Sequence, residues 1–256
     1  MCTLVILRRP DHPWPVVIGA NRDEMLGRPA LSPARHWPDR PEVVAGLDQL
    51  AGGSWLGIND WGVAAAILNR HGSLGPDPGQ RSRGELVLEA LDHPDAVAAA
   101  EALSHFDPRA YRTFNLILAD NRDGFWLRHA DTGHIEVRPL KDGLSIVAAG
   151  EIDDLRTRRL ELAAPKFRAV APPDPDRDDW RDWEALLSDD ESPPGEPAEA
   201  ALRFRLPRGY GTVSSALIAL PEPNAGERKP RFRYAQWQPA QLPWADVSFA
   251  AAKRVR

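Results

Sequence analysis

Residues 2–24 read CTLVILRRPDHPWPVVIGANRDE, and this stretch decides how the chain begins to fold. The run TLVIL is apolar and rich in β-branched residues, which is typical of a buried strand. The prolines of RRPDHPWP interrupt it, and VVIGA then has the same strand pattern. Two such runs are expected to pair as an antiparallel hairpin. The hairpin would return the polar residues after VVIGA to the beginning of the chain.

The rest of the chain alternates between strand and helix patterns. Strands are predicted in 52–60 and 62–69, then in 114–120, 124–130, 134–140 and 144–150, and finally in 212–220 and 231–238. Helices are predicted in 83–92, with Ser82 as the cap, in 94–104, which Pro94 would open, and in 153–167. Most predicted strands follow one another through tight turns, so the sheets should be largely antiparallel.

One segment differs in composition from the rest. From Pro172 to about residue 198 the sequence is acidic and rich in proline, with one amphipathic run, WRDWEALL. We interpret it as a surface excursion that carries one helix within a single domain spanning residues 1–256. Sheets covered by helices fit this order of elements.

The composition narrows the classes of function. The formal net charge is −5, so no general basic excess points to nucleic acid, and short basic runs are expected on solvated faces. No run of 18 apolar residues predicts a membrane-spanning helix, and the beginning of the chain does not have the pattern of a signal peptide. A single cysteine excludes an intrachain disulfide, and a cytoplasmic location is expected.

Most catalytic motifs are missing from the sequence. It has no His-Glu-x-x-His, no cysteine pair, no P-loop, no dinucleotide-binding glycine turn and no Gly-x-Ser-x-Gly. The seven histidines are scattered, so no metal site is predicted.

Cys2 is therefore the first candidate for chemistry. If the initiator Met1 is removed, Cys2 carries both a thiol and an α-amine, whose ordinary pKa of about 7.7–8.0 allows it to accept the thiol proton. Such a residue can act as an N-terminal nucleophile. The alternative is a small buried residue that begins a strand.

The NRDE residues, 21–24, would lie beside Cys2 in the predicted hairpin. The Arg22 guanidinium would favour the thiolate, and a carboxylate would orient the α-amine. The alternative is a polar turn with an internal ion pair.

The start of the chain, MCT, and the block GANRDE resemble the NRDE family, which is transport and Golgi organisation protein 2-like. The resemblance continues through AGLDQLAGGSWLGIND, GVAAAILN, RSRGEL, FNLILAD and GYGT, to about residue 220. The family is similar to the N-terminal nucleophile hydrolases. The resemblance therefore implies an α+β fold, a four-layer αββα sandwich of largely antiparallel sheets.

The resemblance also implies a set of site residues. Cys2 matches the nucleophile of the cysteine hydrolases, and Arg22 and Asp23 match an Arg and an Asp after the second strand, at a shorter spacing. Asn69 would be an oxyanion-hole donor. Asn21, Glu24 and Trp55 are expected to bind the ligand. Such an enzyme would act on non-peptide C–N bonds of a small molecule and needs no cofactor.

Two departures from the hydrolases remove polar groups from this site. Gly150 or Glu151 stands where the hydrolases keep an Asn, and Val213 stands where related sequences carry an Arg. These two losses leave a reduced, altered or absent hydrolase activity open. The resemblance to the family also implies an alternative, a non-enzymatic protein that binds and traffics haem inside the cell. A weaker alternative is a role in lipid or acyl-CoA metabolism, which no individual residue of the sequence supports.

Overall fold

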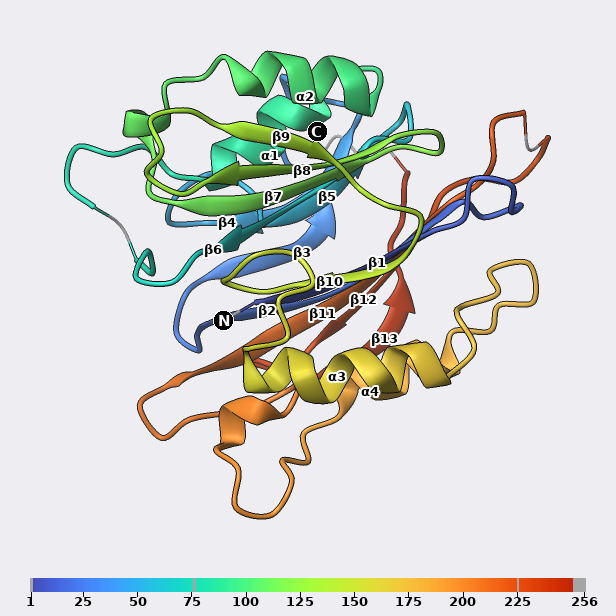
Figure 1. The fold of residues 1–256 in the computed structure, drawn as a ribbon. Helices are drawn as coiled ribbons and strands as arrows, with labels where there is room; N and C mark the ends of the chain where they lie inside the picture. The colour runs from blue at the N-terminus through green and yellow to red at the C-terminus, as the bar shows by residue number, and fades with distance from the viewer. Residues whose placement is uncertain (1, 76, 225, 251–256) are drawn as a thin grey trace, which may run out of the picture. The chain divides into compact units, whose positions relative to one another are not determined.

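The structure is a computed structural model that describes residues 2–75, 77–224 and 226–250. The described chain consists of two compact units (Figure 1). Unit 1 comprises the chain up to Arg28 together with Lys141–Asp246, and unit 2 comprises Pro29–Leu140 together with the chain from Val247. The predicted site residues near the beginning of the chain all belong to unit 1.

Unit 1 is built on a six-stranded sheet with the order β10-β1-β2-β11-β12-β13. Neighbouring strands are antiparallel throughout. The strands are β1 (Thr3–Arg8), β2 (Val16–Met25), β10 (Gly143–Val147), β11 (Tyr210–Leu220), β12 (Arg231–Gln236) and β13 (Leu242–Asp246). The predicted hairpin is confirmed, because β1 and β2 pair with Ile6 opposite Ile18.

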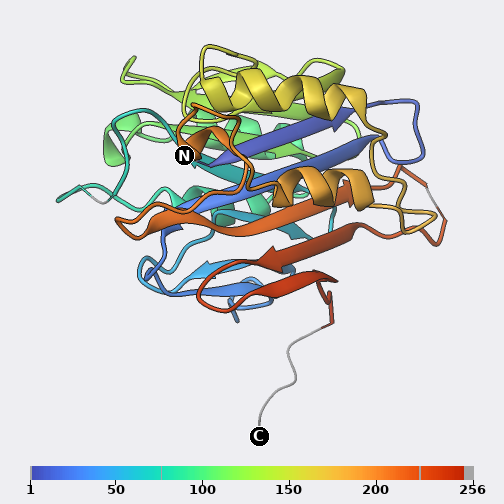
Figure 2. The ribbon, with the colours of Figure 1, turned by 90° about the horizontal axis from the view of Figure 1, so that it is seen from below.

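Two helices, α3 (Arg158–Ala169) and α4 (Arg181–Ser188), cover one face of this sheet (Figures 1 and 2). Their apolar side chains form one core with Val5, Val17 and Leu217 of the strands. Gly19 allows the close contact, since a Cβ there would lie 3.2 Å from the Trp183 ring. A short 3-10 helix, η2 (Ala198–Ala200), follows α4.

Unit 2 is built on a seven-stranded antiparallel sheet with the order β3-β4-β5-β6-β7-β8-β9. The strands are β3 (Ala30–Ala34), β4 (Val43–Asp48), β5 (Leu56–Asn59), β6 (Ala64–Asn69), β7 (Phe114–Ala119), β8 (Gly124–His129) and β9 (Glu136–Pro139). Helices α1 (Gly84–Leu91) and α2 (Ala96–Ser104) pack on one face over a separate apolar core, and the 3-10 helix η1 (Pro108–Ala110) follows them.

The helix starts differ slightly from the sequence prediction. Arg83, not Ser82, is the N-cap of α1, although the Ser82 hydroxyl does accept a hydrogen bond from the Gly84 N–H. Asp95, not Pro94, precedes α2, and its carboxylate accepts a hydrogen bond of 2.7 Å from the Ala98 N–H. An Asp at the N-cap satisfies one of the helix's unpaired N–H groups, which a proline cannot do.

The predicted fold class is confirmed: the protein is α+β, with two antiparallel sheets and a helical layer on each. Three strands were not predicted, namely β3, β4 and β13. The predicted strand 144–150 became β10, which pairs with β1 and so belongs to unit 1. The single-domain boundary stays a prediction. The proline-rich segment does carry the expected helix, α4, and its Trp183 is buried in the unit 1 core.

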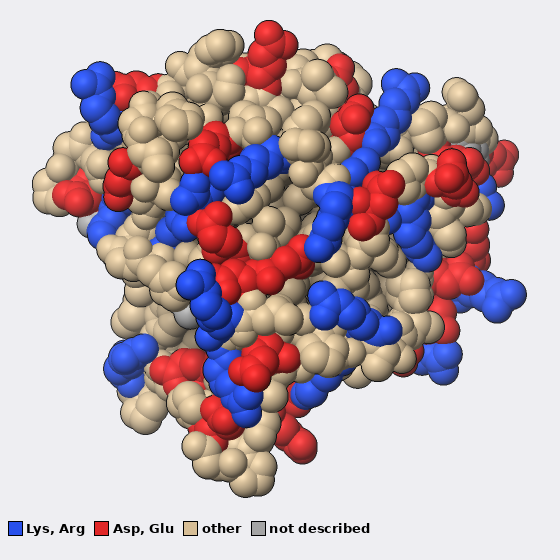
Figure 3. Space-filling model, viewed as in Figure 1, with Lys and Arg blue, Asp and Glu red and all other residues tan. Residues whose placement is uncertain are grey.

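Charged side chains of both signs are interspersed on the face shown in Figure 3. Many are paired; for example, Arg233 contacts Glu184 at 2.7 Å. Among the described residues, no helix combines the length and the apolar sequence needed to cross a membrane. The predicted cytoplasmic location and the predicted absence of nucleic acid stay predictions.

Candidate active site

The register of the first hairpin determines which side chains share a face of the unit 1 sheet. Thr3 lies opposite Asn21, and Leu4 lies opposite Ala20. Because successive side chains of a strand point to opposite faces, Thr3, Asn21 and Asp23 face the layer of α3 and α4. The same alternation puts Cys2 and Arg22 on the other face.

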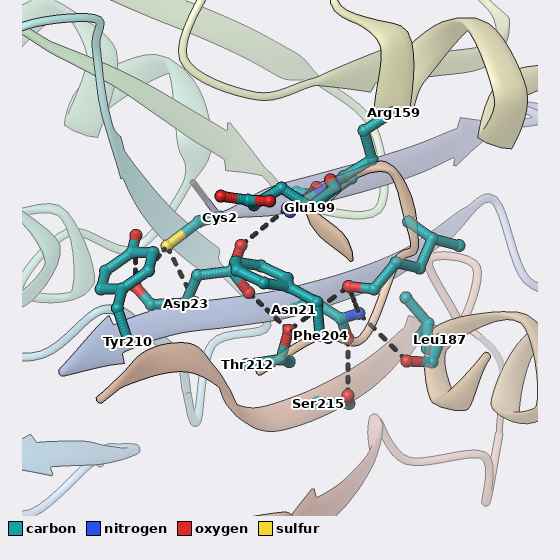
Figure 4. Close-up of polar contacts among 12 residues, drawn as sticks. Cys2, Asn21, Asp23, Arg159, Leu187, Glu199, Phe204, Tyr210, Thr212 and Ser215 are labelled. Atoms are coloured by element: carbon teal, nitrogen blue, oxygen red, sulfur yellow. Dashed lines mark hydrogen bonds and ion pairs between the residues drawn. The ribbon is translucent and has the colours of Figure 1, made fainter. Parts of the chain in front are cut away.

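The Cys2 thiol is held by the backbone of Asp23 (Figure 4). The Asp23 N–H donates a hydrogen bond of 3.4 Å to Sγ, and the thiol lies 3.7 Å from the Asp23 carbonyl oxygen, which can accept its proton. The Tyr210 hydroxyl donates to the same carbonyl oxygen at 3.4 Å. The structure thus brings together Cys2 and Asp23, as the sequence predicted.

The surroundings of the thiol favour its neutral form. Burial raises the pKa of the Cys2 thiol, and the negative charge of Asp23 raises this pKa further. The backbone hydrogen bond from Asp23 and the positive charge of Arg22 lower the pKa, but they do not reverse the shift. The Arg22 charge thus favours the thiolate, as the sequence predicted, but burial of the thiol outweighs this charge and keeps the pKa raised.

The Asp23 carboxylate lies on the helix side of the sheet and is fully buried. Its Oδ2 accepts a hydrogen bond of 2.7 Å from Nη1 of Arg159, and its Oδ1 accepts one of 2.8 Å from the Thr212 hydroxyl. Charge-assisted bonds of this length are among the strong hydrogen bonds of proteins. Asp23 therefore links β2 to helix α3 and to β11 (Figure 4).

Arg159 and Thr212 are polar site residues that sequence reasoning missed. Arg159 belongs to the first turn of α3 and is 4% exposed. It lies one and two turns before Ala163 and Phe167, both buried residues of the same helix. An arginine on the apolar stripe of an amphipathic helix was the available signal, since such a charge needs a buried partner.

The GYGT block, residues 209–212, has a physical role in this arrangement. A Cβ at Gly211 would lie 2.4 Å from the Phe204 carbonyl oxygen, so only glycine permits the crossing of these two segments. The Thr212 N–H then donates to that oxygen at 2.9 Å, and the Thr212 hydroxyl accepts from the Phe204 N–H at 3.2 Å. The crossing places the Thr212 hydroxyl against Asp23.

Val213 lies at a bulge in β11. Thr212 is paired with Asp23, and Ser214 is paired with Arg22, so Val213 is the extra residue of its strand. Its carbonyl oxygen accepts a hydrogen bond of 2.8 Å from the Trp237 N–H. Gly150 and Glu151, the other departure from the hydrolases, lie half-buried in the turn that follows β10.

Asn21 holds backbone segments together. Its amide group donates hydrogen bonds to the Leu187 carbonyl at 3.0 Å and to the Leu202 carbonyl at 2.9 Å. Its oxygen accepts a hydrogen bond of 2.5 Å from the Ser215 hydroxyl. Both amide hydrogens are thus used inside unit 1, and in this conformation neither is available to a ligand. The predicted contact of Asn21 with a ligand stays untested.

Glu24 and Arg22 form a loose polar group at the end of β2. The Arg22 guanidinium lies 4.0 Å from the Glu24 carboxylate, which lies 3.7 Å from Arg28. The other Glu24 oxygen accepts a hydrogen bond of 2.8 Å from the Met25 N–H. The ion pair between Arg22 and Glu24 is the alternative that the sequence left open for the NRDE residues. It is present together with the contact between Asp23 and the Cys2 thiol.

Asn69 and Trp55 belong to unit 2. Asn69 ends β6, where it is paired with Phe114, and no side-chain hydrogen bond of Asn69 is found among the described residues. The Trp55 indole packs on Gly46, where a Cβ would lie 2.3 Å from the ring. The roles predicted for these two residues, oxyanion-hole donor and ligand contact, stay predictions.

No metal centre is evident in the part of the chain that the structure describes. No group of three or more His, Cys, Asp or Glu side chains there is arranged to hold a metal ion. The Cys2 thiol is the one sulfur ligand that the sequence could offer to haem iron apart from methionine, and in this conformation it contacts Asp23.

Solved structures with a similar fold are N-terminal nucleophile hydrolases. One is the N-acylethanolamine-hydrolyzing acid amidase ortholog of Caenorhabditis elegans, with a TM-score of 0.59, 14% identity, and 88% of this chain and 96% of that chain covered. Another is a mutant of conjugated bile acid hydrolase from Clostridium perfringens, with a TM-score of 0.58, 13% identity, and 96% and 92% covered. At these identities the likeness establishes the fold alone.

Curated relatives share sequence with part of the chain. The mouse Transport and Golgi organization 2 homolog is 37% identical over 111 residues, and the bovine homolog is 39% identical over the same length. Each match spans 41% of this chain and 38% of the relative. The family model described as Transport and Golgi organisation 2 matches residues 1–224, which is most of the sequence. The chain therefore belongs to the Transport and Golgi organisation 2 family, on an N-terminal nucleophile hydrolase fold.

Proposed function

We propose that the protein hydrolyses a non-peptide amide bond of a small molecule, with Cys2 as the nucleophile. The observation that carries this proposal is the position of the thiol. The protein's one cysteine precedes the first strand of the unit 1 sheet, and the backbone of Asp23 holds its Sγ. Asp23 is itself bound by Arg159 and Thr212, so the nucleophile rests on a rigid support.

Such a nucleophile needs a base, because burial raises the pKa of the Cys2 thiol. The α-amine of Cys2 can serve as that base once Met1 is removed, since its ordinary pKa is about 7.7–8.0. Removal of Met1 is part of the proposal, and Met1 lies outside the described residues. Intact mass spectrometry of the purified protein measures it directly; a chain that retains Met1 would contradict the self-activating mechanism.

The reaction takes place in two steps. In the first, the α-amine accepts the thiol proton, Sγ bonds to the amide carbonyl carbon, and the C–N bond breaks. The leaving amine takes the proton from the α-ammonium group. In the second, the α-amine accepts a proton from water, and the resulting hydroxide attacks the thioester carbon. The C–S bond then breaks, and the α-ammonium group returns the proton to sulfur. This releases a carboxylic acid and the Cys2 thiol, so that one water is consumed in each cycle.

The comparisons support this choice of reaction without determining it. Both structural relatives named above are hydrolases by name, of N-acylethanolamines and of conjugated bile acids. In the Clostridium protein the second residue is a cysteine, which that mutant replaces by alanine. We further propose that Asn69 donates to the oxyanion, in which case its replacement by alanine should lower turnover by about 10²–10³-fold.

The test is turnover of a panel of N-acyl amides by three proteins, wild type, Cys2→Ala and Cys2→Ser. We expect hydrolysis by the wild type alone, together with a mass increase equal to the acyl group on the chain after rapid acid quenching. Cys2→Ala should fold normally, since the change removes one sulfur atom. Hydrolysis that survives in Cys2→Ala would refute Cys2 as the nucleophile.

Haem binding stays the alternative, and the same proteins test it. If Cys2 ligates haem, titration should give a Soret band whose position differs between the wild type and both variants. A wild type that binds haem at micromolar affinity and hydrolyses no amide in the panel would favour the haem-binding role over catalysis.

A further inference from the structure

Arg159 contacts two residues beside the nucleophile, Thr3 in the chain and Asp23 on the neighbouring strand. Its Nη1 lies 2.7 Å from Oδ2 of Asp23 and 3.4 Å from the hydroxyl of Thr3, which follows Cys2. Its Nε donates to the Glu199 carbonyl at 2.7 Å, and its guanidinium lies 4.5 Å from the centre of the Phe204 ring (Figure 4). Groups from β1, β2, η2 and Phe204 thus fix this guanidinium of α3 from several directions.

Stability alone is a poor explanation of this pair. The side chains of Asp23 and Arg159 are 0% and 4% exposed, and desolvation of two charges can cost more than their attraction returns. Apolar side chains would fill the same space between α3 and the sheet, as Ala163 and Phe167 do farther along the helix. A charged pair retained in such a core is expected to specify an arrangement of the groups around it.

We propose that Arg159 is a positioning residue for Cys2. It binds the Asp23 carboxylate on the helix side of the sheet, and the Asp23 backbone binds the thiol. It also compensates the negative charge that Asp23 places near the sulfur. The inference rests on the proposed function, because that function gives the reason for positioning the thiol. The geometry and the test of the inference do not require a substrate.

Several charged or titratable groups lie near the thiol. Asp23 and Arg22 of β2 act on its ionisation, and Tyr210 of β11 interacts with Cys2, Asp23 and Glu24. Arg159 of α3 binds Asp23. The Asp23 charge raises the pKa of the thiol, whereas the Arg22 charge lowers it. Removing the positive partner of Asp23 should therefore raise the thiol pKa, and removing the Asp23 charge should lower it.

The experiment is the pH dependence of alkylation of the single cysteine by iodoacetamide, in protein whose amino terminus has been verified by mass. In Arg159→Met the midpoint of the rate profile should move upward by about half a pH unit or more, because an opposite charge near an ionisable group typically acts on this scale. In Asp23→Asn it should move downward. Arg159→Lys keeps the charge and should stay close to the wild type.

Arg158→Met is the matched control, since Arg158 is the neighbouring arginine of the same helix and is 45% exposed. It should leave the midpoint unchanged. If Arg159→Met does not fold, the double variant Arg159→Met with Asp23→Asn carries no unpaired buried charge. Its midpoint should lie above that of Asp23→Asn, which keeps the Arg159 charge, and below that of the wild type, because the nearer Asp23 charge is gone.

A purely structural role would move all the site variants the same way, toward the ordinary thiol value, as the site loosens. That result, or an Arg159→Met midpoint equal to that of Arg158→Met, would overturn the inference. A wild type without amidase activity would refute the proposed function. Alkylation needs no substrate, so the pH profiles of the variants would still test the inference. Cys2-dependent turnover with an unmoved midpoint would refute the inference alone.

Discussion

The Thr212 hydroxyl offers the sharpest test of the geometry around Asp23, and we expect Thr212→Val to destabilise the protein. Thr212 is 3% exposed, and valine has nearly the same shape, so the change removes the hydrogen bonds of the hydroxyl and little else. The two short ones are the 2.8 Å bond that it donates to Asp23 and the 3.2 Å bond that it accepts from the Phe204 N–H, and a longer contact of 3.4 Å reaches the Leu202 carbonyl.

The expected loss follows from these two bonds. A hydrogen bond to a charged group contributes about 1.5–3 kcal/mol, and a buried donor left without a partner costs about 1–3 kcal/mol. The two terms overlap, so we expect the free energy of unfolding to fall by about 3 kcal/mol. Thr212→Ser keeps the hydroxyl and loses one methyl group, which corresponds to about 0.8 kcal/mol.

Urea unfolding followed by circular dichroism measures both changes as shifts of the midpoint at unchanged slope. The valine variant should be clearly less stable than the serine variant, although valine is the more apolar residue. If Thr212→Val is as stable as the wild type, or more stable than Thr212→Ser, the hydroxyl does not hold Asp23. The support that we describe for Cys2 would then be wrong.

Three further predictions follow from buried groups. Gly211→Ala should lower the free energy of unfolding by about 2–4 kcal/mol, because its Cβ would meet the Phe204 carbonyl oxygen at 2.4 Å; a thermal melt equal to that of the wild type would contradict this close approach. Burial raises the pKa of Tyr111 and of Tyr210 above the ordinary value near 10, so the stability that these phenols contribute is present below about pH 10 and is lost at higher pH. Absorbance titration with the Phe variant of each should show two phenols that ionise only on unfolding, and normal ionisation in the folded protein would count against their burial. Burial also lowers the pKa of His129, so its contribution to stability is present above about pH 6.5 and is lost as the pH falls through the lowered pKa; a normal imidazole titration by NMR would contradict this.

Much of the fold could be predicted because its signals are local. The apolar, β-branched runs TLVIL and VVIGA predict β1 and β2, and the short interval between them predicts the hairpin. The strands that were missed have weak local signals. In β3 (Ala30–Ala34) a proline interrupts the pattern, and β13 (Leu242–Asp246) carries another proline beside a tryptophan. Prolines are depleted in strands and are tolerated at sheet edges, where both of these strands lie.

The assignment of strands to sheets could not be predicted from such patterns. The segment 144–150 follows three strands of unit 2 in the sequence, yet β10 pairs with β1 at the other end of the chain. Its apolar pattern is the same in either sheet. Which partner it takes depends on the path of the chain between the two units, and local periodicity contains no information about that path.

The sequence by itself determined the nucleophile candidate and its nearest companions. Cys2 is the one thiol, and the hairpin brings residues 21–24 back to it, because pairing of adjacent strands is a short-range property. Only the tertiary structure decided which charges act there. Asp23 meets Arg159 and Thr212 on the helix side of the sheet, 136 and 189 residues away along the chain, whereas the adjacent Arg22 lies on the face that carries Cys2. Side chains alternate between the two faces of a strand, so neighbours in the sequence lie on opposite faces of the sheet. Packing of a helix on the sheet brings residues that are distant in the sequence into contact. The burial that results, rather than the nearby arginine, decides the protonation of the thiol.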